Sequence, residues 1–108
     1  MARGRLQEEL VERTEMFSDR CVAVAEQLDR DGRFRRLVEQ LAASGSSVGA
    51  NVAEAEQAMS RSDFLKCMAI ATKEIAETRF SLRLCIRRGW ISAVSLQPLL
   101  SRSWKNFA

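Results

Sequence analysis

The stretch "SGSSVGANVAEA", from Ser44 to Ala55, decides how this chain divides into helices. Its first half has the composition of a flexible linker, and its second half has that of a helix. Apolar residues on both sides of it keep helical spacing, and the spacing continues in phase across the glycines and serines. These apolar residues are Leu37, Leu41, Val48, Val52, Ala55 and Met59. A linker has no reason to preserve phase, so we predict one helix over residues 34–58, with a local linker as the alternative.

Small residues in this stretch form a patch of their own. Gly45, Gly49 and Ala53 recur every four residues, which places them on one side of the predicted helix. A glycine inside a helix costs about 0.5–1 kcal/mol relative to alanine, so we expect tertiary contacts to offset it. The patch predicts a close approach by another helix or another subunit. The alternative is that these small residues have no packing role.

Two further long helices are predicted, over about residues 5–30 and 61–88. Both carry apolar residues at alternating steps of four and three, which is a heptad pattern. Ser60 can cap the second of them, with Asp63 three residues later, and Gly89 follows its last turn. Gly32 is placed to end the first. In the second, the apolar positions include Phe64, Met68, Ala71, Ile75, Thr78, Leu82 and Cys85.

The fourth helix is expected to be short, over about residues 97–106, because Pro98 fits best in a first turn. So short a helix cannot cover partners more than twice its length. A second apolar stripe on the predicted helix 61–88 could contact another copy of the chain, or could be the edge of a broad core-facing stripe. Its members are Ala69, Ala76, Phe80 and Leu84. We therefore predict an all-α, antiparallel four-helix bundle, one domain over residues 1–108, that assembles into a homo-oligomer.

Composition limits the functions that this chain can have. It has 108 residues and no histidine, which removes most metal sites, the Ser-His and Cys-His pairs and the commonest general base. We therefore expect no cofactor, no metal and no enzymatic activity. Three cysteines without a C-x-x-C pair fit reduced thiols, and no apolar run spans a membrane or forms a signal peptide. These features predict a cytoplasmic protein.

Charge is unevenly distributed, although the net charge is only +3. Residues 37–60 contain no Lys or Arg, whereas residues 61–108 contain nine of them against three acidic residues. Arg79, Arg83 and Arg87 recur every four residues, with Arg88 beside them, and form a basic ridge on the predicted helix 61–88. The ridge predicts contacts with the phosphates of RNA or DNA. The alternative is a solvated face that complements the helix dipole.

Carboxylates near the predicted core raise the question of a metal centre. Inward glutamates can hold two metals in a bundle, but that site also needs Glu-x-x-His motifs, and this chain has no histidine. We predict instead a polar network between the second and third helices that fixes their register. Its members would be Asn51, Glu54, Lys73, Glu74, Glu77 and Thr78.

Two motifs together resemble a known family. "NVAEA" (Asn51–Ala55), a short polar joint and "RSDFLKCMAIATKEIAETRFSLRLCIRRGWI" (Arg61–Ile91) resemble the four-helix-bundle proteins found in intervening sequences of bacterial 23S ribosomal RNA genes. The chain is also similar to accessory proteins of diversity-generating retroelements. The resemblance implies an up-down-up-down bundle, a homopentamer and, for the second group, association with nucleic acid. This chain departs from the pattern in its short, proline-containing fourth helix and its Gly- and Ser-rich second helix.

Two functions follow as hypotheses. The first is a non-enzymatic, homo-oligomeric scaffold or accessory protein that binds RNA or DNA through the basic ridge. The second is an oligomeric adaptor that binds only an unidentified protein partner and has no affinity for nucleic acid. A small-molecule or catalytic site around Glu54, Lys73 and Glu74 is the third and weakest.

Overall fold

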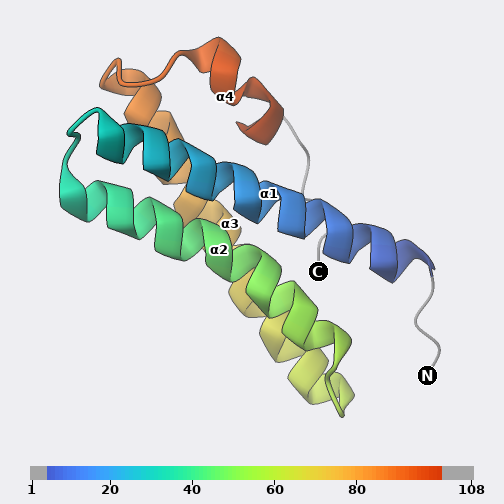
Figure 1. Ribbon diagram of the computed structural model, residues 1–108. Coiled ribbons are helices and arrows are strands. Elements are labelled where there is room, and N and C mark those ends of the chain that lie inside the picture. Colours follow the sequence, from blue (N-terminus) through green and yellow to red (C-terminus); the bar gives the residue numbers. More distant parts are fainter. Residues whose placement is uncertain (1–4, 101–108) are drawn as a thin grey trace.

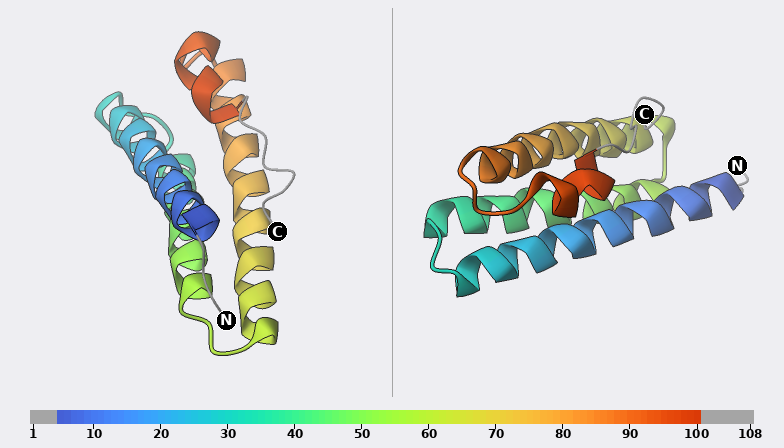
Figure 2. Two further views of the ribbon diagram at one scale, coloured as in Figure 1. Left: turned by 90° about the vertical axis from the view of Figure 1, so that its right-hand side faces the viewer. Right: turned by 90° about the horizontal axis from the view of Figure 1, so that it is seen from above.

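Four helices make up the part of the chain that the structure describes. The structure is a computed structural model, which describes the backbone of residues 5–100 and the side chains of residues 8–100. The helices are α1 (Arg5–Arg30), α2 (Arg35–Glu56), α3 (Arg61–Arg87) and α4 (Ala93–Leu100). Figure 1 shows α2 running back alongside α1 and α3 lying against α2. In Figure 2, α4 lies between α1 and the C-terminal half of α3.

The stretch from Ser44 to Ala55 is helical throughout, as the unbroken phase predicted. Both of its glycines face α1 of the same chain. A Cβ atom added at Gly45 would lie 2.5 Å from the Cβ of Cys21, and one at Gly49 would lie 2.8 Å from the Ser18 hydroxyl. Real Cβ atoms do not approach so closely, so only glycine allows the two helices to lie at this separation. Gly45 and Gly49 thus lie at a close contact between two helices of the same chain, whereas Ala53 is exposed.

The Ser18 hydroxyl joins α1 to α2 at this close approach. It donates a hydrogen bond to the Gly45 carbonyl at 2.7 Å and accepts one from the Gly49 N–H at 2.9 Å. In an α-helix these two backbone groups are each other's ordinary partners, since each N–H bonds the carbonyl four residues earlier. A side chain of α1 thus takes part in the hydrogen bonding of the α2 backbone.

The core follows the predicted heptad patterns. Along α3, Met68, Ala71, Ile75, Leu82 and Cys85 are all buried, as predicted. Buried side chains of the other helices complete the core: Phe17, Cys21, Ala25 and Leu28 from α1, Val38, Leu41, Val48, Val52 and Ala55 from α2, and Leu96 and Leu99 from α4.

The C-terminal ends of α1 and α3 are built in the same way. Gly32 and Gly89 have φ angles of +71° and +72°, in the left-handed region that glycine adopts without strain. The N–H of Arg33 bonds the carbonyl of Leu28, and the N–H of Trp90 bonds the carbonyl of Cys85. Each helix therefore ends in a Schellman motif. Both glycines have the helix-ending role that the sequence predicted.

Two predictions at the ends of helices were wrong. The fourth helix begins at Ala93 instead of residue 97, because the Ser92 hydroxyl accepts a hydrogen bond from the Ser95 N–H and caps it. Pro98 consequently lies inside the helix, and the predicted residues 101–106 lie outside the described residues. Met59, expected to continue the apolar spacing of α2, is 95% exposed and contributes nothing to the core, because it lies beyond the end of α2 at Glu56.

Candidate nucleic-acid interface

Arg79 does not belong to an exposed basic ridge. It is half-buried on the side of α3 that faces α4, and its Nη2 donates a 2.8 Å hydrogen bond to the Leu100 carbonyl. A cation at the last carbonyls of a helix also complements the helix dipole. Within the described part of the chain its Nε is buried without a hydrogen-bond partner, so this part of the guanidinium is shielded from solvent. The prediction that Arg79 contacts phosphates together with Arg83 is therefore corrected: Arg79 holds α4 against α3.

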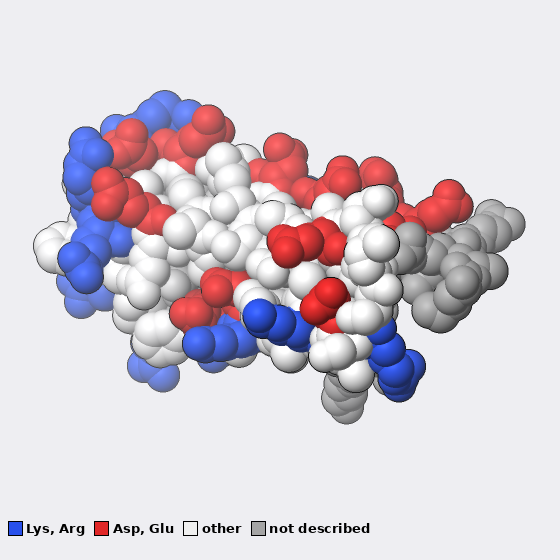
Figure 3. Space-filling model, turned by 90° about the horizontal axis from the view of Figure 1, so that it is seen from below, with Lys and Arg blue, Asp and Glu red and all other residues white. Residues whose placement is uncertain are grey.

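The other three arginines of the predicted ridge are exposed and have neighbours that the sequence analysis missed. Arg83, Arg87 and Arg88 lie at the end of the bundle where α3 stops, and the joint between α1 and α2 lies at the same end (Figure 1). That joint brings four more exposed arginines. We call these seven residues the basic end: Arg30, Arg33, Arg35, Arg36, Arg83, Arg87 and Arg88. Basic side chains gather at this end of the surface in Figure 3.

A contact between two side chains ties the two parts of the basic end together. The guanidinium carbon of Arg33 lies 5.6 Å from the centre of the Trp90 ring, within the range of a cation–π interaction. Arg33 and Trp90 occupy equivalent positions, each directly after the glycine of its Schellman motif. The ends of α1 and α3 therefore meet through the two residues that follow them.

Acidic side chains lie among the basic ones at this end of the surface (Figure 3). Near the seven arginines in the chain, Glu26, Asp29, Asp31 and Glu39 are exposed. The Arg35 guanidinium lies 3.6 Å from the Glu39 carboxylate, and both side chains are largely exposed. Such surface pairs hold their partners only weakly, so Arg35 can exchange Glu39 for another anion.

The polar network predicted between α2 and α3 does not form. The Asn51 amide bonds the Ser47 carbonyl of its own helix, and Glu54, Lys73 and Glu77 are exposed. Thr78 is fully buried, as a network residue should be, but its hydroxyl donates to the hydroxyl of Ser44 at 2.8 Å. A buried hydroxyl pair, Ser44 of α2 and Thr78 of α3, thus joins the two helices in place of the predicted carboxylates.

Glu74 is the only predicted network carboxylate that is half-buried. Burial raises the pKa of its carboxyl, the neighbouring Glu77 raises it further, and Lys73 opposes both effects. The three residues interact along α3 itself, because Lys73 is adjacent to Glu74 and Glu77 follows three residues later. The prediction that Glu74 and Lys73 reach α2 is not supported by any hydrogen bond or ion pair among the described residues.

The second apolar stripe of α3 lies mostly on the surface. Ala69 and Ala76 are exposed, Phe80 is 60% exposed, and Leu84 is half-buried. A shallow hollow borders Phe80 and Ala76 on one side and Leu37 of α2 on the other. The stripe is therefore not part of a broad core-facing surface within this chain.

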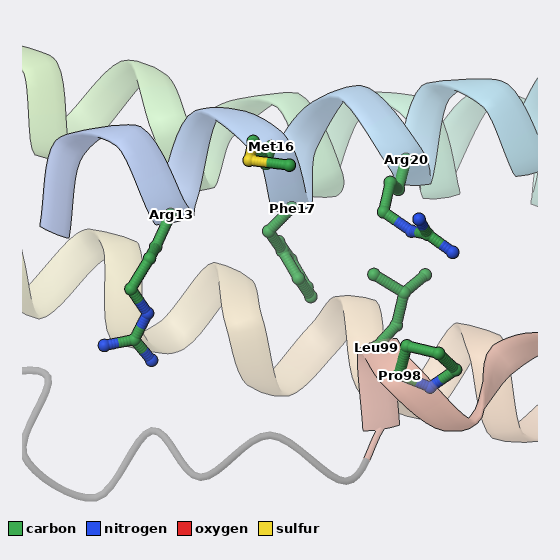
Figure 4. A pocket seen from close by; sticks show the side chains of 6 residues that line it. All are labelled: Arg13, Met16, Phe17, Arg20, Pro98 and Leu99. Carbon is green, nitrogen blue, oxygen red and sulfur yellow. The ribbon is translucent and has the colours of Figure 1, made fainter. Parts of the chain in front are cut away.

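A second hollow lies between α1 and α4 (Figure 4). Phe17 points from α1 toward Leu99 of α4, and Arg13, Met16, Arg20 and Pro98 complete the lining. Its volume of about 140 Å³ is below that of ordinary small-molecule sites. Within residues 8–100, no three Cys, Asp or Glu side chains cluster in a way that could hold a metal ion. No helix in the described part of the chain combines the length and apolarity that crossing a membrane requires.

Together, the fold and this surface define a class: small, all-helical proteins with arginines concentrated at one end. The 23S rRNA-intervening sequence protein model matches residues 7–105, so the chain belongs to that family. The chain is also similar to a solved structure from Bacteroides thetaiotaomicron, described as a protein of unknown function from the S23 ribosomal protein family. The two are 33% identical with a TM-score of 0.82, over 88% of this chain and 85% of that one. No curated protein matches the sequence.

Proposed function

We propose that this protein is a non-enzymatic, homo-oligomeric scaffold that binds RNA or DNA through the basic end. The observation that carries the proposal is the convergence of seven exposed arginines from two separate segments at one end of the bundle. Arginine presents five donors in a rigid fork that matches phosphate geometry. Because these side chains are exposed and, apart from Arg33, take no part in the contacts described for the fold, they can contact a phosphate backbone.

Assembly would strengthen such binding. Each copy has a net charge of +3 and one basic end, so an oligomer presents several basic ends to one polyanion. Binding at the second end is then intramolecular, which raises the overall affinity. Each neutralised phosphate also releases condensed counterions, so affinity falls steeply with salt. The family resemblance and the antiparallel, up-down-up-down arrangement that it implies favour a pentamer.

The first prediction tests the location of the binding surface. Replacing Arg36, Arg87 and Arg88 by glutamine should weaken binding to RNA or DNA about tenfold or more at low salt, because three phosphate contacts are lost. The slope of log K against log salt should become shallower by roughly two to three. Fluorescence anisotropy with labelled RNA and DNA at several salt concentrations measures both quantities.

The matched control removes the same charge elsewhere. Arg61, Lys66 and Lys73 are exposed residues of α3 that lie outside the basic end. Their replacement by glutamine gives a protein of the same net charge as the first variant. Its affinity should stay within about twofold of the wild type. Equal losses in both variants would show that binding follows net charge alone and would refute the assignment to the basic end.

The apolar outer face of α3 supports homo-oligomerisation. Leu65 and Phe80 are 45% and 60% exposed, and Ala69 and Ala76 lie on the same side of the helix. A heptad-like helix usually buries one apolar face, and α3 already buries another against α2 and α4. A second copy of the chain would cover this outer face and the hollow beside Phe80.

The second prediction concerns this face. The substitution Phe80→Glu should dissociate the oligomer into monomers, because a buried, unpaired carboxylate would be strongly unfavourable at the subunit contact. Light scattering coupled to size-exclusion chromatography gives the mass directly. Val94 of α4 is 84% exposed, and Val94→Glu serves as the control that should leave the mass unchanged. A wild-type protein that is monomeric at micromolar concentration would refute the assembly proposal.

The exposed Phe80 face also favours a second candidate function, an oligomeric adaptor for another protein. An exposed apolar patch is a common feature of protein interaction sites. The adaptor predicts no salt-sensitive affinity for RNA or DNA, even at low salt, and a defined protein partner in a pulldown that Phe80→Glu abolishes. The anisotropy measurement described above separates the two functions.

A further inference from the structure

Phe34 stands in an unusual place for a phenylalanine. It belongs to the joint that contributes to the basic end, directly between Arg33 and Arg35 in the chain, and is 66% exposed. It is also the N-cap residue of α2, where Ser, Thr, Asp or Asn would stabilise the helix by a side-chain hydrogen bond. Phe34 makes no such bond and does not join the buried core. Neither packing nor capping within the chain therefore explains an aromatic residue here.

The surroundings of Phe34 indicate what it can bind. Arg33 and Arg35 flank the exposed Phe34 in the chain, within the joint that contributes four arginines to the basic end, and Arg33 contacts Trp90. A positive surface that carries an exposed aromatic side chain is typical of proteins that bind single-stranded nucleic acid, in which bases stack on the ring while cations follow the phosphates. A lone exposed phenylalanine is unremarkable on a protein surface, but this one has the complementary charge around it.

We infer that the basic end binds single-stranded RNA or DNA with one base stacked on Phe34. The inference rests on the proposed function and adds the strand state of the nucleic acid. In a duplex, the base faces are already stacked on each other, so a ring on a surface joint can reach only unpaired bases. The arginines bind the phosphates of either form, and Phe34 therefore supplies the preference for single strands.

The test compares strand forms of one probe sequence. A labelled 12-nucleotide strand, as RNA and as DNA, lies within the footprint of about 4–16 nucleotides of known single-strand binding domains. Its fully complementary duplex is the comparison. The wild type should bind the single strand more tightly than the duplex. Phe34→Ala should weaken single-strand binding about tenfold and leave duplex binding within about twofold.

Three further measurements separate stacking from other effects. Because Phe34→Ala removes no charge, its slope of log K against log salt should equal that of the wild type. Phe34→Trp, which keeps a stacking surface, should restore single-strand affinity. Met59→Ala, which removes another highly exposed apolar side chain in the joint between α2 and α3, should change nothing.

The outcomes distinguish this inference from the proposed function. Loss confined to single strands in Phe34→Ala, with rescue by Phe34→Trp, supports the inference. Equal wild-type affinity for single strands and duplex, or equal losses on both in Phe34→Ala, overturns the stacking inference but leaves the nucleic-acid function in place. A wild-type protein that binds neither form at low salt overturns both. Capture of a second protein copy by Phe34 would appear as a lower mass of Phe34→Ala in light scattering and would also overturn the inference.

Discussion

Replacing Gly45 by valine is expected to lower the free energy of unfolding by about 3 kcal/mol or more. Even a Cβ alone at this position would lie 2.5 Å from the Cβ of Cys21, and 3.2 Å from its sulfur. Neither Cβ can rotate away, because each is fixed by its own backbone. The helices α1 and α2 must therefore separate, which opens the core around Cys21 and strains the hydrogen bonds of Ser18.

Helix propensity alone would stabilise Gly45→Val, so a loss of stability can be assigned to the helix contact. Valine is a somewhat better helix former than glycine, so a solvent-exposed position would gain a few tenths of a kcal/mol from the same substitution. Ala43 is exposed on the same helix, and Ala43→Val serves as the control with an expected loss below about 1 kcal/mol. Chemical denaturation of both variants gives the two free energies. Similar small losses at Gly45 and Ala43 would show that α1 and α2 do not approach each other as described.

The second large effect is a loss of stability at high pH, and it involves Cys21, the α1 residue that contacts Gly45. Burial raises the pKa of the Cys21 thiol from 9.0 to about 12, and the nearby Arg20 opposes the shift. The folded protein therefore holds the neutral thiol, whereas the unfolded chain releases the proton near pH 9. The stabilisation is complete below pH 9 and is lost as the pH rises from 9 toward 12.

At pH 10 the expected loss from Cys21 alone is about 1.4 kcal/mol, and it grows by about the same amount for each further pH unit until the folded thiol itself titrates. Urea denaturation at pH 7 and pH 10 measures it, with Cys21→Ala as the comparison. The pKa of the Cys85 thiol is also raised by burial, but Cys85 is present in both proteins, and its contribution cancels. If the wild type and Cys21→Ala lose equal stability between the two pH values, Cys21 is accessible to water in the folded protein.

Much of the fold could be predicted because its signals are local and periodic. The α3 positions from Met68 to Cys85 recur at steps of four and three, and a helix that packs on one side needs that spacing. The phase across Gly45 and Gly49 identified α2 as one helix for the same reason. The predicted start of α4 lies too late in the chain, because Pro98 indicates a first turn whereas the hydroxyl of Ser92 caps the helix further upstream.

The candidate site was harder to predict because it depends on which segments meet in space. Counting charge by segment hid the arginines of Arg30–Arg36, since acidic residues, most of them earlier in α1, balance them in number. The sequence "DGRFRR" (Asp31–Arg36) already indicated a basic joint between the first two helices. Because α1, α2 and α3 run in alternating directions, this joint and the C-terminal end of α3 lie at the same end of the bundle (Figure 1). Arg79 was misassigned because the four-residue spacing it shares with Arg83 does not show which side of α3 is covered by α4.

The hydroxyl of Ser18 has a consequence for how the molecule moves. It bonds both the carbonyl of Gly45 and the N–H of Gly49. Unwinding, sliding or rotation of the middle of α2 therefore requires that these two hydrogen bonds to α1 break at the same time. Local fluctuations that would otherwise begin at a glycine-rich turn are thereby tied to the separation of two whole helices. The Gly- and Ser-rich stretch, whose composition resembles a linker, thus opens only together with α1, as one cooperative unit.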